Sequence, residues 1–234
     1  MTTFVLVHGA WHGGWCWRRV RKLLREAGHE VFTPTLTGLG ERAHLAGPEV
    51  GLRTHVQDVV AVFEAEDLTD VVLVGHSYGG MVVTGVAGEA AERLRSIVYL
   101  DAFVPESGKA LADYIPDATL ADIRAAAAEH GGGWRVPPFP VEVFGVDDPD
   151  DARWVGSRLT PHPLKTLTEA LPPGNPAAAR PPRAYVYCSV RPMGLFEQFR
   201  DFARREGWPG HVLATGHDAM VTDPRGVAAI LLAH

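Results

Sequence analysis

A serine flanked by glycines, directly after a short apolar run, is the strongest chemical signal in the chain. The segment Gly75-His76-Ser77-Tyr78-Gly79-Gly80 has the pattern G-x-S-x-G and comes immediately after Val71–Val74. Between a strand and a helix, this pattern forms a turn so tight that only small residues fit two positions either side of the serine. The turn exposes the hydroxyl at the carboxyl end of the strand, so Ser77 is predicted to be a nucleophile. An incidental serine in a glycine turn is one alternative; a phosphate-binding loop is a weaker one, because no Lys-Ser/Thr pair follows the glycines.

The base that such a serine needs is sought among the histidines, whose reference pKa near ~6.5 suits the task. The chain has 11 histidines, so position has to select among them. His217 comes three residues after the last apolar run and before a helix start at 223–224, which places it at the same sheet edge as the serine. We therefore predict His217 as the base. The others are assigned elsewhere: His76 should point away across the turn, His8 should brace the next loop, His29 and His211 enter strands, and His12, His44, His55, His130, His162 and His234 lie on surfaces or loops.

The third group of such a site is a carboxylate at the same sheet edge. Asp101 ends the fourth apolar run and is the only acidic residue directly at the carboxyl end of a strand beside the serine. The loop after the fifth run, residues 189–194, contains no acidic residue. We predict Asp101 as the acid, with Glu197 as the second choice and loop bracing or helix capping as the alternative role for Asp101. Asp218 adjoins His217 in sequence, where a productive bond to the ring is awkward.

Two backbone N–H groups beside the serine are predicted to hold the negatively charged oxygen of an acyl-transfer intermediate. One is the N–H of Tyr78, the residue after the nucleophile. The other is sought in the glycine-bearing loop 8–15 after the first strand, where we choose the N–H of Ala10. This loop precedes a helix N-terminus, which also favours negative charge. Removing one such donor typically lowers kcat by ~10²–10³.

Six short apolar runs rich in Val, Ile and aromatic residues are predicted to form buried parallel strands, because polar residues do not alternate along them. Helical patterns separate most of these runs, and this alternation indicates an open, doubly wound α/β sheet flanked by helices. Two expected helices have clear start signals, a capping box at Thr54 and the pair Asp223-Pro224. The predicted strands are Phe4–Val7, Glu30–Thr33, Val71–Val74, Ile97–Leu100, Ala184–Cys188 and His211–Ala214, and further helices are expected at Trp15–Ala27, Met81–Ala91 and Leu195–Arg205.

A long segment between the fourth and fifth strands, residues 105–183, exceeds what a plain crossover needs. It contains helical pieces at Leu120–His130 and Pro163–Leu171 with Pro-rich joints. We interpret it as a helical lid inserted into a core of residues 1–104 and 184–234, with an irregular structural insertion as the alternative. Four aromatic residues of this segment are expected to line a substrate pocket, or alternatively to form the interior of the lid: Trp134, Phe139, Phe144 and Trp154. Three residues from outside the segment are also expected to line the pocket: Trp11, Leu39 and Phe103.

Composition and charge narrow the class of partner and the environment. The 234 residues carry a formal net charge of −6 and no block of Lys or Arg, which argues against nucleic acid or an anionic membrane as the main partner. The amino terminus has no signal-peptide pattern, and its apolar run is far shorter than the ~20 residues of a membrane span. Cys16 and Cys188 are too few for a disulfide framework and lack metal-ligand spacing. We therefore expect a cytoplasmic protein with reduced cysteines, a small-molecule substrate, no metal and no cofactor.

Three segments of the chain resemble the α/β-hydrolase superfamily. They are residues 4–15, the serine motif at 75–80 and Gly216-His217-Asp218-Ala219-Met220. More narrowly, the chain is similar to the branch that holds plant methylesterases, salicylate-binding esterases and hydroxynitrile lyases, and residues 35–42 and 100–105 resemble its bacterial esterase members. The resemblance spans both ends and the sheet and is weakest in the inserted segment. It implies an α/β-hydrolase fold with a six-stranded, mostly parallel sheet, a Ser-His-Asp triad and no cofactor.

Two departures from this branch bear on the predicted reaction. Its plant members usually carry the acid after the fifth strand of this count, where this chain has none, so the role shifts to Asp101. Its lyases use a Thr in the oxyanion loop and a Lys after the catalytic His, and the corresponding positions here are Gly9 and Asp218. A leaving cyanide needs a cation near it, and the negative charge of an Asp at this position disfavours that reaction. We predict a serine carboxylesterase that forms an acyl-enzyme with a small or medium apolar ester. The alternatives are a thioesterase, lactonase or polyketide-ester hydrolase, a lyase or decarboxylase, and a non-catalytic ligand-binding module.

Overall fold

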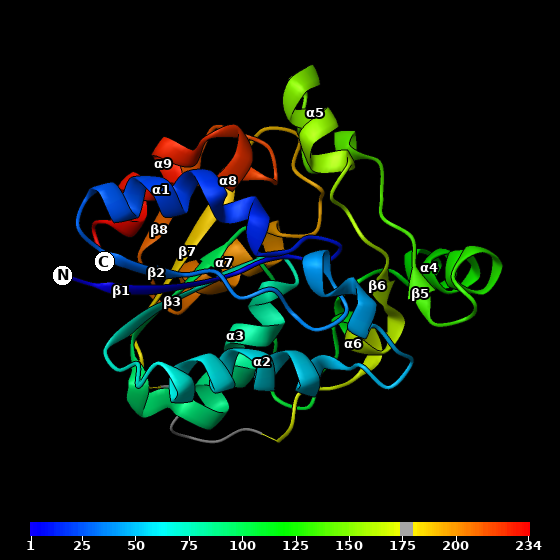
Figure 1. The fold of residues 1–234 in the computed structure, drawn as a ribbon, viewed down its shortest axis with the longest axis horizontal. Helices are drawn as coiled ribbons and strands as arrows, with labels where there is room; N and C mark the ends of the chain where they lie inside the picture. The colour runs from blue at the N-terminus through cyan, green and yellow to red at the C-terminus, as the bar shows by residue number, and fades with distance from the viewer. Residues whose placement is uncertain (174–179) are drawn as a thin grey trace.

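A six-stranded parallel sheet forms the centre of the protein (Figure 1). The computed structural model describes residues 1–173 and 180–234. Every neighbouring pair of strands in this sheet runs parallel, in the order β2-β1-β3-β4-β7-β8. The predicted fold class is thereby confirmed. The strands of the sheet are β1 (Thr3–Val7), β2 (Glu30–Phe32), β3 (Val71–His76), β4 (Leu94–Leu100), β7 (Arg183–Cys188) and β8 (Gly210–Leu213).

The strand that leads to the serine, β3, lies in the middle of this sheet. All of its residues are buried, because β1 and β4 pair with its two edges and helices cover both faces. Apolar side chains removed from water on both faces stabilise such a strand by about 25 cal/mol per Å² of buried area. The outer strands β2 and β8 are more exposed. The carboxyl ends of β3 and β4 therefore lie side by side in the best-buried part of the sheet.

Helices cover both faces of the sheet, as the alternation of strands and helices predicts. α1 (Arg18–Glu26) and α9 (Pro224–Leu231) pack together on one face, and α2 (Leu52–Ala65) and α3 (Gly79–Ala90) pack together on the other (Figure 1). α7 (Glu197–Arg205) follows β7 and contacts it. The short helical elements of the core are α8 (Ala219–Thr222) and the 3₁₀ turns Gly14–Trp17, Gly40–Leu45 and Ala91–Arg93.

The two helix-start signals in the sequence have different outcomes. Asp223 caps α9 as predicted, because its carboxylate accepts the N–H of Gly226 at 2.9 Å. The predicted start at Thr54 is wrong by two residues, since α2 begins at Leu52 with Gly51 as its N-cap. The Thr54 hydroxyl reaches back and accepts the N–H of Gly51 at 3.3 Å, so it acts from within the first turn.

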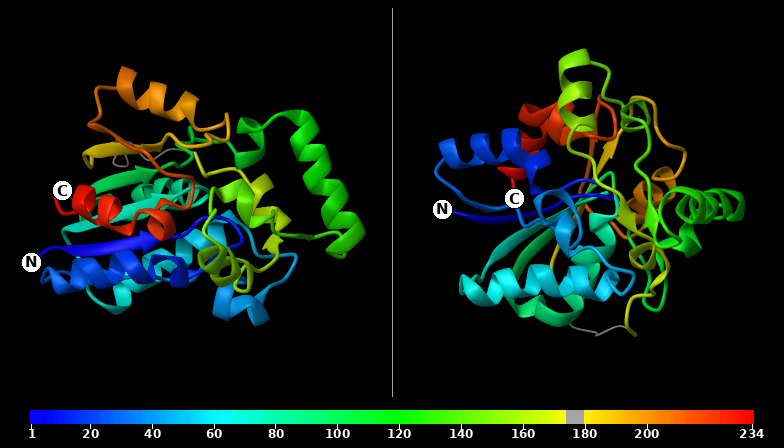
Figure 2. Two further views of the ribbon diagram at one scale, coloured as in Figure 1. Left: turned by 90° about the horizontal axis from the view of Figure 1, so that it is seen from above. Right: turned by 45° about the vertical axis from the view of Figure 1, so that its right-hand side comes forward.

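In the segment between β4 and β7, the elements α4 (Asp117–His130), β5 (Arg135–Val136), β6 (His162–Pro163) and α6 (Leu164–Thr168) lie beyond the carboxyl ends of the strands, on the side away from both termini (Figure 1, Figure 2). The segment contains a short antiparallel pair, β5 and β6, and its buried apolar side chains join the core of the sheet. Its action as a lid stays a prediction, and residues 174–179 of the predicted lid lie outside the described residues. Its helices are α4, α5 (Pro149–Gly156) and α6, with 3₁₀ turns at Leu111–Tyr114 and Val141–Phe144.

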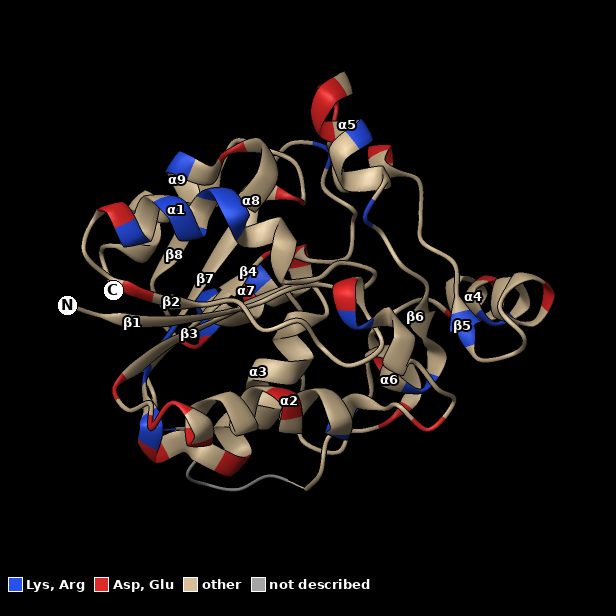
Figure 3. Cartoon of the chain, viewed as in Figure 1, with Lys and Arg blue, Asp and Glu red and all other residues tan. Residues whose placement is uncertain are grey.

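Charged side chains of both signs are interspersed over the helices (Figure 3). Arg19 on α1 pairs with Asp151 on α5, which links the inserted segment to the core, and Arg42 pairs with Asp58 at 3.1 Å. Exposed pairs of this kind contribute about 0–1 kcal/mol each, so the apolar core does most to hold the fold together. Within residues 1–173 and 180–234, the structure has no helix with the length and apolar character that a bilayer crossing demands.

Candidate active site

Ser77 occupies the turn between β3 and α3 with a strained backbone. Its φ is +53°, in the left-handed region that a residue with a side chain rarely adopts. The turn is so tight that a Cβ atom on Gly75 would lie 2.7 Å from the carbonyl oxygen of Gly79. The Ser77 carbonyl accepts the N–H groups of Gly80 and Phe103 at 3.0 and 3.2 Å. The local geometry is that of the predicted nucleophile turn, and Ser77 stays partly accessible within it.

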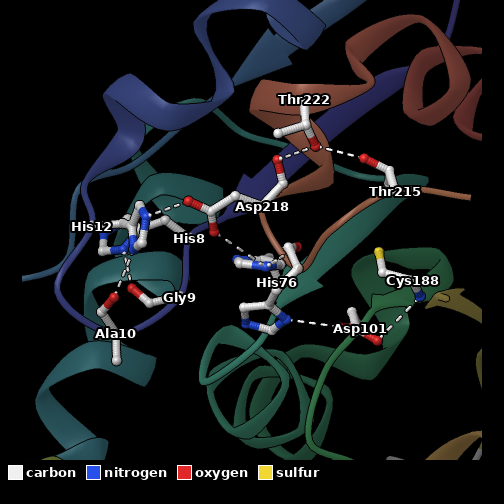
Figure 4. Close-up of polar contacts among 11 residues, drawn as sticks. His8, Gly9, Ala10, His12, His76, Asp101, Cys188, Thr215, Asp218 and Thr222 are labelled. Atoms are coloured by element: carbon white, nitrogen blue, oxygen red, sulfur yellow. Dashed lines mark hydrogen bonds and ion pairs between the residues drawn. The ribbon is translucent and has the colours of Figure 1, made fainter. Parts of the chain in front are cut away.

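His217 and Asp101 form a short, buried hydrogen bond beside this turn, and Figure 4 shows the other contact of Asp101, to Cys188. Nδ1 of His217 lies 2.7 Å from Oδ2 of Asp101, and the two side chains are 4% and 3% exposed. The second carboxylate oxygen, Oδ1, accepts the N–H of Cys188 on β7 at 3.2 Å. Because Nδ1 of His217 faces a carboxylate, it carries the proton, and Nε2 is left as the basic nitrogen of the neutral ring. The structure thus brings the predicted base and acid together, while their catalytic roles stay predictions.

Asp101 reaches this position because β4 lies between β3 and β7. The N–H of Ser77 donates to the carbonyl of Leu100 at 3.3 Å, and the N–H of Asp101 donates to the carbonyl of Val186 at 2.7 Å. Asp101 therefore follows the strand next to the serine, with a left-handed backbone at φ +41°. Glu197, the second candidate for the acid, instead accepts the Tyr187 hydroxyl at 3.0 Å.

Two neighbouring rings hold the plane of His217. Phe196 stacks on it with a centroid distance of 4.9 Å and an interplanar angle of 13°, and the centroid of His76 lies 4.5 Å away. Nε2 of His76 lies 3.0 Å from the carbonyl oxygen of His217 and donates its proton there. The expectation that His76 points away across the turn is therefore wrong, because its ring packs directly against the predicted base.

A buried ion pair lies against the loop of residues 8–15, here called the oxyanion loop (Figure 4). Nε2 of His12 lies 3.0 Å from Oδ2 of Asp218, and its Nδ1 lies 2.7 Å from the carbonyl oxygen of Ala10. Both ring nitrogens face acceptors, so His12 is held as an imidazolium. Burial lowers the pKa of His12, but the Asp218 carboxylate outweighs burial, so this pKa is raised overall. Burial raises and His12 lowers the pKa of Asp218, with the lowering dominant. His12 lies in a loop, which agrees with its assignment to a surface or loop, but this loop is enclosed by the fold and the side chain is buried.

Three more histidines are buried around the site, and each uses its ring nitrogens in hydrogen bonds. Nε2 of His8 accepts the backbone N–H of Leu36, in the loop after β2, at 3.1 Å, and its Nδ1 lies 2.8 Å from the carbonyl oxygen of Gly9 in the loop that it was predicted to brace. Nε2 of His55 donates to the carbonyl of Thr37 at 2.8 Å, and its Nδ1 accepts the hydroxyl of Tyr78 at 2.9 Å. The surface assignments of His55 and His162 are wrong, because α2 and the inserted segment carry them into the interior.

The buried neutral histidines predict a loss of stability in mild acid. Burial lowers the pKa of His8 to about 3 and that of His55 to about 4, and it holds the pKa of His76 and His162 well below the ordinary value. In the unfolded chain each of them binds a proton below pH ~6.5, so the free energy of unfolding falls as the pH falls. Between pH 7 and 5 this loss is about 2 kcal/mol for each histidine that stays neutral in the fold. His12 acts in the opposite sense, because its raised pKa lets the fold hold this proton at a higher pH than the unfolded chain does, and its stabilising contribution is complete below pH ~6.5.

Urea unfolding at pH 7, 6 and 5 measures this effect. We expect the free energy of unfolding to fall steeply in the wild type and by about 2 kcal/mol less in His55→Gln, which removes one of the neutral groups. His44→Gln is the matched control, because His44 is exposed and its replacement should leave the drop unchanged. A free energy of unfolding that stays level between pH 7 and 5 would contradict the prediction.

The two predicted oxyanion donors lie next to Ser77. Ala10 and Tyr78 line the same cavity as the serine. The oxyanion loop passes so close that a Cβ atom on Gly9 would lie 2.9 Å from the Cβ atom of Ser77. Tyr78 directly precedes α3, whose N-terminal N–H groups favour negative charge. The geometry supports the predicted use of both N–H groups, which stays a prediction.

An apolar cavity of about 510 Å³ opens at Ser77. Three of the residues predicted to line a pocket do line it, namely Trp11, Phe103 and Phe139. Most of the remaining wall comes from the start of the inserted segment and from the loop before α7, and these residues were not among those predicted. Their apolar side chains were the available signal. The lining residues that were missed are Leu111, Asp113, Tyr114, Ile115, Pro116, Thr119, Ile123, Leu167, Met193, Gly194, Leu195, Phe196 and Gln198.

The other four predicted pocket residues lie outside this lining. Leu39 is fully buried in the core, and Phe144 packs against the ring of His12 at 5.3 Å. The ring of Trp154 lies edge-on to that of Trp15, with centroids 5.2 Å apart. The guanidinium of Arg135 covers the ring of Trp134 at 5.0 Å from its centroid. For Phe144 and Trp154 the alternative of structural packing fits best, because both attach the inserted segment to the core.

The cavity wall carries little charge. Among its lining residues, Asp113 is the one Asp, Glu, Lys, Arg or His, and its carboxylate accepts the N–H of Ala110 at 2.8 Å. Thr119 and Gln198 add uncharged polar groups. A neutral and largely apolar ligand is therefore the class that this wall accommodates with the smallest desolvation cost.

Neither metal-ligating side chains nor thiols among the described residues offer this site a different chemistry. In the described part of the chain, no three His, Cys, Asp or Glu side chains converge on a point that could hold a metal ion. Cys16 and Cys188 are free and buried, and burial raises the pKa of both thiols above the ordinary range. Protonated, enclosed thiols of this kind are poor nucleophiles, so Ser77 stays the predicted nucleophile.

Comparisons with known proteins find esterases and hydrolases that resemble the chain over nearly its whole length. A model of the alpha/beta hydrolase family matches residues 4–230. The carbendazim hydrolyzing esterase of Nocardioides sp. (strain SG-4G) is 44% identical, with 100% of this chain and 99% of that protein covered. The pFDCC methylesterase MES16 of Arabidopsis thaliana is 28% identical, with 98% and 92% covered. Among solved structures, an extracellular alpha/beta-hydrolase from a Paenibacillus species has a TM-score of 0.85 at 26% identity, with 100% and 98% covered.

Proposed function

The chain belongs to the alpha/beta hydrolase family, and we propose that it is a serine carboxylesterase that cleaves a small or medium apolar ester. Its similarity to named esterases along the whole chain supports esterase-type hydrolysis in general. One observation carries the finer proposal. His217 and Asp101 are in contact at 2.7 Å beside the strained turn of Ser77, which opens to an apolar cavity.

The proposed reaction proceeds through an acyl-enzyme. Nε2 of His217 removes the proton from the Ser77 hydroxyl, whose oxygen attacks the ester carbonyl. Asp101 keeps the proton of His217 on Nδ1 and stabilises the imidazolium that forms. The N–H groups of Ala10 and Tyr78 hold the negatively charged oxygen of the tetrahedral intermediate. The imidazolium protonates the leaving alcohol, and a water molecule activated by the same histidine then releases the acid and frees the serine.

The substrate class follows from the cavity wall. Apolar side chains dominate the lining, and no Lys or Arg stands among them to pair with a substrate carboxylate. We therefore propose neutral esters whose acyl or alcohol part fills an apolar space of about 510 Å³. The names of the relatives suggest carbendazim and methyl esters as compounds to include in a substrate panel.

Labelling with a fluorophosphonate, followed by peptide mass spectrometry, tests the nucleophile. The proposal expects one covalent adduct per chain on Ser77 and loss of esterase activity in step with labelling. A panel of aryl, methyl and thio-esters, a lactone and carbendazim then tests the reaction class, with aryl and methyl esters expected to react fastest. An unlabelled Ser77 would instead favour a non-catalytic binding module, and a preference for the thioester or lactone would redirect the assignment within the same chemistry.

A cytoplasmic location is also part of the proposal. Cys16 and Cys188 are both free thiols in the fold, which agrees with a reducing compartment. Fractionation of the native host's cells, with the protein detected by antibody, tests this expectation directly.

A further inference from the structure

We propose that His162, on the inserted segment, is a positioning residue that holds the oxyanion loop in its active geometry. The inference rests on the proposed esterase function, because it concerns how the N–H donors of Ala10 and Tyr78 are kept in place. It assigns the inserted segment a part in the chemistry that is separate from forming the wall of the cavity.

Trp11, the residue after the predicted donor Ala10, has a strained backbone conformation that needs support from its surroundings. Its φ is +63°, a left-handed conformation that costs a bulky residue roughly 1–2 kcal/mol. Strain of this kind persists only where the surroundings hold it, and here the surroundings belong to the inserted segment. The N–H of Thr160 donates to the Trp11 carbonyl at 2.9 Å, and the indole Nε1–H donates to the carbonyl of Val136 at 3.1 Å.

The third contact to Trp11 comes from the side chain of His162. Nδ1 of His162 accepts the backbone N–H of Trp11 at 3.3 Å, so this nitrogen carries no proton. Nε2 therefore carries the proton and donates it to the Thr166 hydroxyl at 2.6 Å, which in turn donates to the carbonyl of Pro163 at 2.8 Å. The chain of donors runs in one direction and sets a single tautomer. Burial also lowers the pKa of His162 well below its ordinary value, which keeps the ring neutral.

His162 touches the second predicted donor as well. Its ring packs against the ring of Tyr78 with centroids 4.9 Å apart at an angle of 76°. The hydroxyl of Tyr78 is held at its far end by His55 at 2.9 Å. One side chain of the inserted segment thus contacts Trp11, which follows the predicted donor Ala10, through a hydrogen bond, and Tyr78, the other predicted donor, through a ring contact. Because the Trp11 N–H is engaged by His162, the peptide plane between Ala10 and Trp11 is fixed.

Three variants separate positioning from general stability. His162→Leu keeps the bulk but removes the acceptor, and it should lower kcat for 4-nitrophenyl butyrate by about tenfold to a hundredfold with little change in KM, as expected for misplaced groups. His162→Asn supplies an acceptor near the position of Nδ1 and should recover most of the lost kcat. Val155→Ala is the matched control, because Val155 is a fully buried residue of α5 that does not line the cavity. It should lower the unfolding temperature while leaving kcat near the wild-type value.

The kcat values of these variants can also overturn the inference. If His162→Asn loses as much kcat as His162→Leu, or if Val155→Ala loses as much as either, then His162 acts only as packing. If His162→Leu does not fold, Thr166→Val takes its place, since it removes the partner of Nε2 and releases the tautomer. Thr166→Val should then lower kcat severalfold with KM unchanged, and an unchanged kcat overturns the proposal.

Hydrogen exchange keeps this inference distinct from the proposed function. The peptide covering residues 8–13 should exchange faster in His162→Leu than in the wild type, His162→Asn and Val155→Ala. This readout needs no turnover. Faster exchange in His162→Leu of a protein that hydrolyses no ester would support the positioning role of His162 and reject the proposed esterase function. Equal exchange in all four proteins would reject the positioning role alone.

Discussion

Replacing Ser77 by alanine should lower kcat/KM for 4-nitrophenyl butyrate by roughly 10⁵-fold or more, the size of loss seen when a serine hydrolase loses its nucleophile. The reason is that neither His217 nor Asp101 can substitute for the missing hydroxyl. Only slow attack by water, helped by the oxyanion donors, would remain. Initial rates measure the loss. The wild type should also release one equivalent of nitrophenol per chain in an initial burst, and the variant should release none.

Ser96→Ala is the matched control for this experiment. Ser96 is a buried serine, 7% exposed, on the neighbouring strand β4, and it does not line the cavity. Its replacement should leave both the burst and the steady-state rate intact. If Ser77→Ala kept a substantial rate, the acyl-enzyme would be excluded, and a reaction of the lyase type, in which His217 only moves protons, would become the better account.

Changing Asp101 to asparagine should lower kcat by about 10³–10⁴ while the fold stays intact. Asp101 now accepts two N–H groups, from His217 and from Cys188. An asparagine has a single carbonyl oxygen, so its NH₂ group must face one of these two donors. If the oxygen stays with Cys188, the NH₂ group faces Nδ1 of His217 and favours the tautomer in which Nε2 carries the proton. That tautomer cannot accept the proton of the serine.

Glu197→Gln is the comparison that makes the Asp101 result decisive. Glu197 was the second candidate for the acid, and in the fold it accepts a hydroxyl from Tyr187. Its replacement should therefore leave kcat close to the wild-type value. Steady-state kinetics of both variants, with circular dichroism to verify folding, measure the difference. A large loss in Glu197→Gln together with near-normal activity in Asp101→Asn would reverse the assignment.

Local signals in the chain were sufficient to predict the sheet and the nucleophile turn. Each strand of the sheet overlaps a predicted apolar run, because strands covered on both faces, such as β3, favour apolar residues along their length. The prediction that all six are buried is wrong for the outer strands β2 and β8, because each has a neighbouring strand on only one side. The turn at Ser77 could also be predicted from the sequence, because its geometry depends on glycines only two residues away. Asp101 followed from strand order, because consecutive parallel strands tend to be neighbours and their carboxyl ends share one edge. These features depend on residues near one another in sequence, or on one adjacency between strands.

Only the tertiary structure decided the state of the histidines and the wall of the cavity. His12 meets Asp218 across 206 positions, and Trp11 meets His162 across 151, so no local pattern could pair them. The sequence assigned His12, His55 and His162 to surfaces or loops, whereas the fold buries all three side chains around the serine. The aromatic residues of the inserted segment were visible in the sequence, but which of them faced the cavity depended on where that segment came to rest. Burial and long-range hydrogen bonds are properties of the packed chain, because each depends on which distant segments cover a side chain and exclude water from it.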